Sequence, residues 1–327
     1  MERRRLGKTG HQVGVVGFGS WAIGGDWGSV DDDTAMAAMH ACIDAGTDFL
    51  DTADVYGDGR SERLIARLRR ERDDPLVVAT KAGRRAPEQD VRHYTPENLR
   101  AWIERSRENL EMERLDLVQL HCPPTDVYYR PEIFEALDAL KDEGLIAAYG
   151  VSVERVEEAI KAIEYPGVAS VQIIFNIFRQ RPADSFLRLA AERDVGVIVR
   201  VPLASGLLTG KFRADSSFAE DDHRRFNRHG EVFDVGETFA GVPYEAGLEA
   251  VEELRPLVPD GATMASWALR WIVDHPEVTT VIPGAKNPEQ ARSNAAAAGL
   301  EPLRADVRER IDALYRKRIG PLVHQRW

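Results

Sequence analysis

Eight short runs of apolar residues recur along the chain, and a longer segment separates each run from the next. Most of these runs are continuously apolar, which is typical of strands buried on both faces of a parallel sheet. Eight such strands alternating with helices favour a closed parallel barrel over an open doubly wound sheet. We therefore predict an α/β fold of the (β/α)8 TIM-barrel class, with strands near residues 13–18, 48–51, 76–80, 117–121, 148–151, 171–175, 197–201 and 279–283.

The segments between the runs carry the 3.6-residue periodicity of amphipathic helices. One helix is expected after Thr95 and Pro96, because threonine caps a helix and proline suits its first position. The stretch 212–241 follows the seventh strand and lacks this periodicity, so we predict a long loop at the carboxyl end of the barrel. Since no low-complexity linker divides the chain, we predict a single domain over residues 1–327.

Charge and composition narrow the classes of partner. A formal net charge of −11 argues against a general affinity for nucleic acid or for an anionic membrane. The two cysteines, Cys42 and Cys122, are expected to be free thiols in a reducing compartment, and they provide no cysteine-based metal site. No run approaches the roughly 20 apolar residues that span a bilayer. We expect a soluble cytoplasmic protein without a metal, and the sequence leaves its oligomeric state open.

Three consecutive predicted strands end in ionisable residues, namely Asp51, Lys81 and His121. The ends of parallel barrel strands open on one face, and neighbouring strands lie about 5 Å apart. Asp51 can therefore pair with Lys81, and Lys81 can lie near His121. Tyr56, in the loop that leaves the second strand, can fold back over the same place.

This set of residues suits the reduction of a carbonyl group by hydride. Negative charge develops on the oxygen, so a proton donor must stand beside it. A phenol such as Tyr56 is a weak acid, and a nearby ammonium such as Lys81 favours its phenolate. Asp51 can keep Lys81 charged, and His121 can hold the carbonyl oxygen. A barrel aldolase with Lys81 as a Schiff-base nucleophile is the alternative chemistry.

The chain resembles the aldo-keto reductases in motifs that follow the same order from about residue 5 to residue 298. The resemblance implies that Asp51, Tyr56, Lys81 and His121 form a catalytic tetrad in the roles given above. It also implies that the N-terminal segment closes the bottom of the barrel. The matching stretches are 51–57, 80–81, 116–121, 149–152, 171–172 with Asn176, 202–211 and 282–286 with Gln290 and Asn294.

The same resemblance implies a nicotinamide cofactor, with NADPH preferred to NADH. The expected cofactor-binding residues are Ser20, Trp21, Asp51, Ser152, Gln172, Arg200, Pro202, Leu203, Ser205, Gly206, Lys211, Gly284, Lys286, Gln290 and Asn294. Asn287 and Pro288 independently predict a helix start, which favours a phosphate. Lys286 is placed for the 2′-phosphate of NADP, or else is an ordinary surface lysine.

Three positions depart from the pattern of the family. Val153 stands where many members have asparagine, and Ser293 where many have glutamate. Arg200 stands where many members stack an aromatic residue on the nicotinamide, so it could stack there, or reach a phosphate or the substrate.

The substrate pocket is expected in the loops, with Trp21, Trp27, Tyr128 and Tyr129 at its rim and Tyr56 and His121 at its centre. Aromatic walls suit a small apolar or sugar-like carbonyl compound. Further polar contacts are expected from His93, Arg224 and His229.

Two functions follow from the resemblance. The first is reduction of aldehydes or ketones, or the reverse oxidation of alcohols. The second is an NADP-binding regulatory subunit that senses redox state with little turnover, like the β subunits of potassium channels.

Overall fold

Eight parallel strands form the centre of the protein in the computed structural model, which describes residues 1–25 and 27–327. Their order is β10-β9-β8-β7-β6-β5-β4-β3. Parallel bridges from Val16 to Val281 and from Gly19 to Gly284 join the two edges and close the barrel. The predicted barrel is therefore confirmed, with strands β3 (Phe18–Gly19), β4 (Phe49–Asp51), β5 (Val77–Ala82), β6 (Leu117–His121), β7 (Tyr149–Ser152), β8 (Val168–Ile174), β9 (Gly196–Arg200) and β10 (Thr280–Val281).

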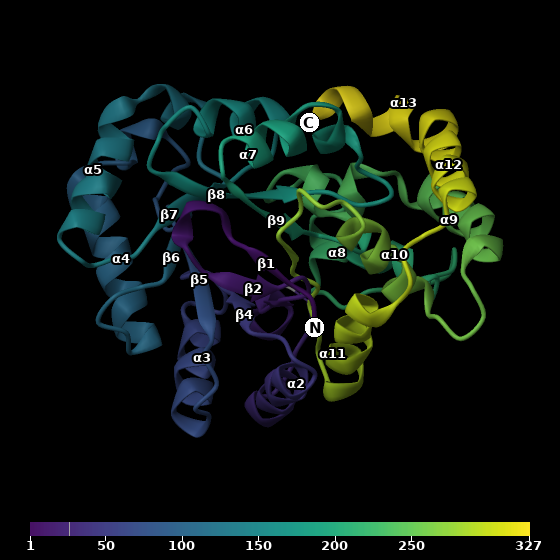
Figure 1. The fold of residues 1–327 in the computed structure, drawn as a ribbon, viewed down its shortest axis with the longest axis horizontal. Coiled ribbons are helices and arrows are strands. Elements are labelled where there is room, and N and C mark those ends of the chain that lie inside the picture. Colours follow the sequence, from purple (N-terminus) through teal and green to yellow (C-terminus); the bar gives the residue numbers. More distant parts are fainter. Residues whose placement is uncertain (26) are drawn as a thin grey trace.

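Helices follow the strands and cover the outside of the barrel (Figure 1). Two predicted helix starts are present as caps: Thr95 Oγ1 accepts from Asn98 N at 3.3 Å, and Asn287 Oδ1 accepts from Gln290 N at 2.9 Å. The covering helices are α2 (Asp32–Asp44), α3 (Arg60–Glu71), α4 (Pro96–Leu110), α5 (Pro131–Asp142), α6 (Val156–Ala162), α7 (Phe186–Glu192), α9 (Tyr244–Leu254), α10 (Met264–Val273) and α11 (Pro288–Ala295).

Shorter and C-terminal helices complete the chain. These are α1 (Trp21–Gly24), α8 (His223–Phe226), α12 (Ala305–Leu314) and α13 (Gly320–Val323). Across the described residues, none of the helices combines the length and the apolar character needed to cross a membrane.

An N-terminal hairpin closes the bottom of the barrel, as expected. Its strands β1 (Arg3–Arg5) and β2 (Gln12–Gly14) pair antiparallel. Leu6 and Val13 are fully buried, and they belong to one apolar cluster with Phe49 and Ile198 from the barrel strands. The hairpin therefore fills the amino-terminal end of the barrel.

The prediction of one strand over 13–18 is wrong. Val13 belongs to β2 of the hairpin, whereas Phe18 belongs to β3 of the barrel. Gly17 lies between them, and a Cβ there would come within 2.9 Å of the Phe49 ring. One continuous apolar run therefore contributes residues to both sheets, because no polar residue separates the end of the hairpin from the first barrel strand.

The long segment after β9 has little regular structure, as predicted. It contains α8 and two short 3-10 turns at Val235–Glu237 and Phe239–Gly241. Ser205 Oγ donates to the Glu237 carbonyl at 3.0 Å and accepts from Phe239 N at 3.0 Å. The end of the segment is thereby held against the loop that directly follows β9.

Candidate active site

The four predicted catalytic residues meet at the carboxyl end of the barrel. Lys81, in β5, donates from Nζ to Asp51 Oδ2 at 2.6 Å, to the Thr52 carbonyl at 2.8 Å and to Tyr56 Oη at 3.3 Å. The Tyr56 and His121 rings are 5.9 Å apart and nearly perpendicular. Lys81 is only 1% exposed, so its charge acts through a medium of low polarity.

Burial and neighbouring charges set the protonation of these groups. Burial raises the pKa of Tyr56, and the Lys81 ammonium offsets this effect only in part. Burial lowers the pKa of Lys81, but the charges of Asp51 and Tyr56 outweigh it and leave the pKa raised. Burial, with Arg84 next in size, holds the pKa of His121 well below its usual value. Near neutral pH the site therefore holds a phenol, an ammonium and a neutral imidazole.

A cavity of about 640 Å³ begins at this group of residues. Asp51, Tyr56 and His121 line it, while Lys81 lies behind them. His121 Nδ1 is buried without a hydrogen-bond partner among the described residues. The phenol and the imidazole thus face a space large enough for a ligand.

The rest of the cavity is lined by most of the residues expected to bind the cofactor. It extends from the tetrad to the amino-terminal end of α11, where Asn287 caps the helix. The expected residues found on its surface are Trp21, Asp51, Gln172, Arg200, Pro202, Leu203, Ser205, Gly206, Lys211, Gly284, Lys286, Gln290 and Asn294.

Two expected cofactor residues lie behind the cavity wall. Ser20 Oγ donates to the Asp51 carbonyl at 2.7 Å, and Ser152 Oγ lies 3.5 Å from Cys122 Sγ. Both serines are fully buried and are not part of the lining. The structure therefore does not bring these two side chains to the cavity surface.

Two cations lie together at the far end of the cavity. Lys286 Nζ donates to the Trp27 carbonyl, and the Arg224 guanidinium stands 4.9 Å from the centre of the Trp27 ring. Burial lowers the pKa of Lys286, and Arg224 adds to this effect. Lys286 is therefore a partly buried wall residue, and the two cations can bind a phosphate group.

Aromatic side chains form one wall beside the tetrad. The Trp21 ring lies 6.2 Å from the Tyr56 ring at an interplanar angle of 17°, and 5.5 Å from the Trp27 ring at 90°. His223 stacks on the outer side of this wall, 4.8 Å from Trp21. Trp21 and Trp27 both line the cavity, as expected for substrate contacts.

The predicted position of Tyr128 at the rim is wrong. Tyr128 is fully buried and lies outside the cavity lining, because the 3-10 turn at Thr125–Tyr129 points its ring into the core. Tyr129 is 64% exposed and lies beside Lys161 instead. Of the three further polar residues expected at the pocket, Arg224 lines it, whereas His93 and His229 do not.

A second buried group of charges, here named the arginine cluster, was not predicted. It consists of Arg84, Glu154, Arg200 and Glu237. Arg84 Nη2 lies 2.5 Å from Glu237 Oε1 and 3.4 Å from Glu154 Oε1, and Arg200 Nη2 lies 2.9 Å from Glu154 Oε2. Four separate loops and strand ends supply these residues, so no sequence spacing indicated the cluster.

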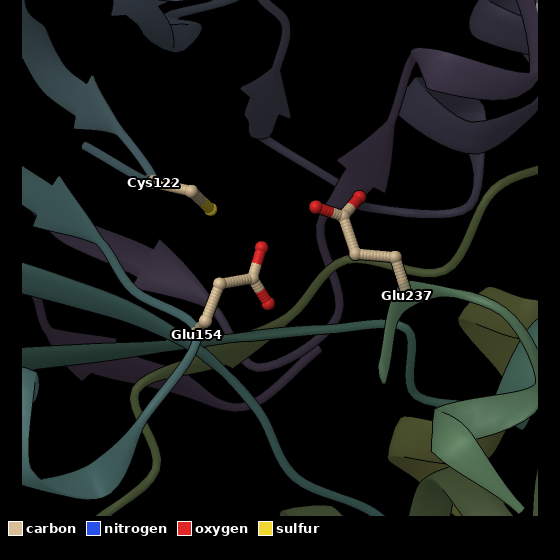
Figure 2. A group of neighbouring side chains, drawn as sticks. All are labelled: Cys122, Glu154 and Glu237. Carbon is tan, nitrogen blue, oxygen red and sulfur yellow. The ribbon is translucent and has the colours of Figure 1, made fainter. Parts of the chain in front are cut away.

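Cys122 completes a group of potential metal ligands with Glu154 and Glu237. Figure 2 shows the thiol and both carboxylates directed toward one another, and their ligand atoms lie within 4.8 Å. Each carboxylate already pairs with an arginine, and burial raises the pKa of the thiol to about 12. The donor set is thus held by ion pairs and a protonated thiol, which disfavours a cation.

The model of the aldo/keto reductase family matches residues 15–316, which is most of the chain. The chain belongs to the aldo/keto reductase family. Aldo-keto reductase YhdN of Bacillus subtilis is 29% identical over 305 residues, which cover 91% of this chain and 89% of that protein.

Two other family members differ in their described roles. A probable voltage-gated potassium channel subunit beta of Arabidopsis thaliana is 28% identical, with 93% of each chain covered. The solved structure of glycerol dehydrogenase AKR11B4 from Gluconobacter oxydans superposes with a TM-score of 0.79, at 28% identity over 97% of this chain and 96% of that one. The family thus includes both named enzymes and named channel subunits.

Proposed function

We propose that this aldo/keto reductase reduces an aldehyde or ketone to an alcohol, or catalyses the reverse oxidation, with NADPH as the preferred cofactor. The observation that carries the proposal is the Lys81 ammonium, which donates to both Asp51 and Tyr56 at the wall of the cavity. A reduced nicotinamide supplies hydride to the carbonyl carbon when it is bound.

Tyr56 is the proton donor in this proposal. Its raised pKa keeps the phenol protonated near neutral pH, and an alkoxide that forms beside it is basic enough to take the proton. Lys81 then stabilises the phenolate, and Asp51 keeps the ammonium charged and in place. His121, as a neutral imidazole, donates a hydrogen bond that positions the carbonyl oxygen.

The lining of the cavity fits a nicotinamide dinucleotide. Gln172 Nε2 donates to Asp51 Oδ1 at 2.7 Å, which fixes an amide that can also pair with a carboxamide. Gly206 has a φ of +99° on the cavity wall, so the backbone there can approach a pyrophosphate closely. Arg200 also lines the cavity, where its ion pair with Glu154 holds the guanidinium in place.

The preference for NADPH rests on Lys286 and Arg224. Both cations line the end of the cavity at the start of α11, where a helix terminus also favours an anion. The 2′-phosphate of NADPH would add an anionic partner for Lys286 and for Arg224, which already pairs with Asp222, whereas the 2′-hydroxyl of NADH would add none.

A fluorescence titration with NADPH and then NADH tests the proposal, followed by an absorbance assay with a panel of aldehydes and ketones. We expect tighter binding of NADPH and turnover of at least one carbonyl compound. Failure to bind either cofactor would overturn the proposed function.

A redox-sensing regulatory subunit is the second candidate, and the channel subunit among the relatives favours it. Such a protein can keep the whole tetrad. The two candidates differ in rate, because a sensor turns over no faster than its cofactor exchanges. Single-turnover and steady-state rates measured on one preparation would distinguish them. A Schiff-base role for Lys81 is disfavoured, because its amine is a buried ammonium paired with Asp51.

A further inference from the structure

The Trp327 side chain fills a narrow slot in the long segment that follows β9. It is 4% exposed, although it follows the short helix α13 on the outside of the barrel (Figure 1). Two glycines form the sides of the slot. A Cβ at Gly241 would overlap the indole ring, and a Cβ at Gly236 would come within 2.9 Å of it. The slot therefore has room for the indole only because both positions lack a side chain.

Two further contacts fix the indole in the slot. Its Nε1 donates to Asp234 Oδ1 at 2.9 Å, and the Arg179 guanidinium lies 3.7 Å from the centre of its ring. Arg179 is 2% exposed and forms no ion pair within the described residues, so the indole face helps to stabilise a buried cation. Arg179 Nη1 also donates to the Ala240 carbonyl at 3.2 Å. Trp327 and Arg179 together hold the 234–241 segment in place.

The same segment also contacts the loop that directly follows β9. Ser205 Oγ donates to the Glu237 carbonyl and accepts from Phe239 N, both at 3.0 Å. Ser205 has a φ of +52° and Ala204 a φ of +47°, which is a left-handed conformation that costs free energy in residues with a side chain. Because the two hydrogen bonds of Ser205 oppose this cost, the 234–241 segment stabilises the strained loop.

The strained loop forms part of the cavity wall. Ser205 and Gly206 both line the cavity, where we propose that a nicotinamide dinucleotide binds with its pyrophosphate close to Gly206. Strained backbone at a ligand site persists only where the surrounding structure holds it. Trp327 does not line the cavity, so its effect on a bound cofactor must pass through the 234–241 segment.

We infer that Trp327 is a positioning residue for the cofactor: it holds the 234–241 segment, which keeps Ser205 and Gly206 in the conformation that accepts a pyrophosphate. This inference rests on the proposed function, because it requires a nicotinamide dinucleotide in the cavity. Once Trp327 is removed, only a fraction of the molecules keep the loop in this conformation, and the apparent affinity falls by that fraction. NADPH and NADH share the pyrophosphate, so both lose affinity to the same extent.

The test measures the Kd values of NADPH and NADH from the fluorescence of the reduced nicotinamide. In Trp327→Ala we expect both Kd values to rise by about 10-fold, which corresponds to about one molecule in ten with the loop in place. Trp327→Phe keeps an aromatic ring over Arg179, so its Kd values should stay within about 3-fold of wild type. Unchanged Kd values in Trp327→Ala, or a rise for NADPH alone, would overturn the inference.

A double-mutant cycle distinguishes this role from a general loss of stability. Ser205→Ala removes the hydroxyl group that joins the loop to the 234–241 segment, so it should raise both Kd values by itself. In that background, Trp327→Ala should raise them by less than about 2-fold, because the connection is already broken. Additive effects of the two substitutions would contradict a path through Ser205.

Trp102→Ala is the matched control. Trp102 is also buried, but it lies in helix α4, where its ring packs edge-on against Tyr94 at a centroid distance of 5.7 Å. We expect the free energy of unfolding to fall in both tryptophan variants, whereas the Kd values should change only in Trp327→Ala. An equal rise of the Kd values in both variants would count against the inference, since lost stability alone would then explain it.

Gly236→Ala provides the same test if Trp327→Ala does not fold. The φ of Gly236 lies outside the left-handed region, so the backbone accepts alanine, but the added Cβ would lie 2.7 Å from Arg179 Nη2 and 2.9 Å from the indole. Displacement of the indole should raise both Kd values, and unchanged values would overturn the inference. If the wild-type protein binds neither cofactor, the proposed function itself is overturned, which distinguishes the two failures.

Discussion

Two buried groups of charges flank the same cavity, and they differ in the cation that they use. The first is the pair of Lys81 and Asp51, where one compact ammonium lies between a carboxylate and a phenol. The second is the arginine cluster, where planar guanidinium groups bind carboxylates from different loops. Lysine is a point charge that can serve a changing partner, whereas arginine holds several fixed partners at once. The first group is therefore suited to proton transfer, and the second is suited to holding the wall of the pocket in a fixed shape.

The largest expected effect is on chemistry at the lysine pair. Tyr56→Phe keeps the ring but removes the proton that Lys81 helps to position, so we expect kcat to fall by about 100-fold to 10,000-fold. NADPH affinity should change little, since Phe keeps the ring in the cavity wall and removes only the hydroxyl group. Steady-state kinetics and a fluorescence titration measure the two quantities. Retained turnover would reject Tyr56 as the proton donor.

Removal of one cation from each group tests the comparison directly. Lys81→Met leaves Asp51 buried without its cation, and we expect the free energy of unfolding to fall by about 3–5 kcal/mol. Arg84→Met leaves Glu237 near Arg200, so a smaller loss of about 1–2 kcal/mol is expected. Denaturant unfolding measures both values.

The same two variants should differ more in turnover than in stability. Lys81→Met removes the charge next to Tyr56 Oη, whereas Arg84 contacts Glu237 and Glu154. We expect the lysine variant to lose far more of its kcat than the arginine variant. Equal losses of kcat would contradict the proposal that the lysine pair acts in catalysis while the arginine cluster fixes the shape of the pocket.

Asp54 extends the comparison, because it is a buried carboxyl group that forms no ion pair within the part of the chain that the structure describes. It lies two residues before Tyr56, fully buried, and both oxygens lack a hydrogen-bond partner among the described residues. Burial, followed by the charge of Glu62, raises its pKa to about 7.

The pH dependence of stability follows from the sign of this shift. Because the folded state holds a proton that the unfolded state loses above pH 4, Asp54 destabilises the fold increasingly between about pH 4 and pH 7. Asp54→Asn should remove that slope and stabilise the protein by about 1–3 kcal/mol at pH 8. Unfolding measured at pH 4.5 and pH 8 tests this expectation, and an equal effect at both values would contradict it.

The smallest expected effect is at Lys286, a cation on a loop whose hydrogen bonds within the described residues include no acidic partner. Lys286→Ala should weaken NADPH binding by about 10-fold, the loss of one charge-assisted contact, and NADH binding much less. Titration with both cofactors measures the difference. Equal weakening would reject the 2′-phosphate role.

The barrel and the tetrad were predictable because both depend on regular spacing. Strand ends in a parallel barrel share one face, so Asp51, Lys81 and His121 could be placed together from the sequence alone. The expected residues that line the rest of the cavity came from the resemblance to the family and not from this rule.

The wrong or missing predictions concern features that the spacing of residues along the sequence does not determine. Tyr128 was expected at the rim, but a loop residue can point inward or outward with the same sequence neighbours. Arg84 and Glu237 were not proposed, because they lie 153 residues apart and meet only through the packing of two irregular loops. The run at 13–18 was predicted as one strand for a similar reason. Burial in the hairpin and burial in the barrel require the same apolar residue types, so the sequence did not show that the run passes from one sheet to the other.

The hairpin at the base of the barrel has a consequence for the order of assembly. Residues 3–14 are synthesised before the barrel strands, yet Arg4 donates to the carbonyl of Val278, which is 274 residues further along the chain. Leu6 belongs to one apolar cluster with Ile198 of β9 and with Ile282, which directly follows β10. The hairpin must therefore remain undocked until β9 and β10 have been synthesised, and such distant contacts form slowly. The edge strands β3 and β10 and the hairpin therefore come together late in folding, when the barrel closes.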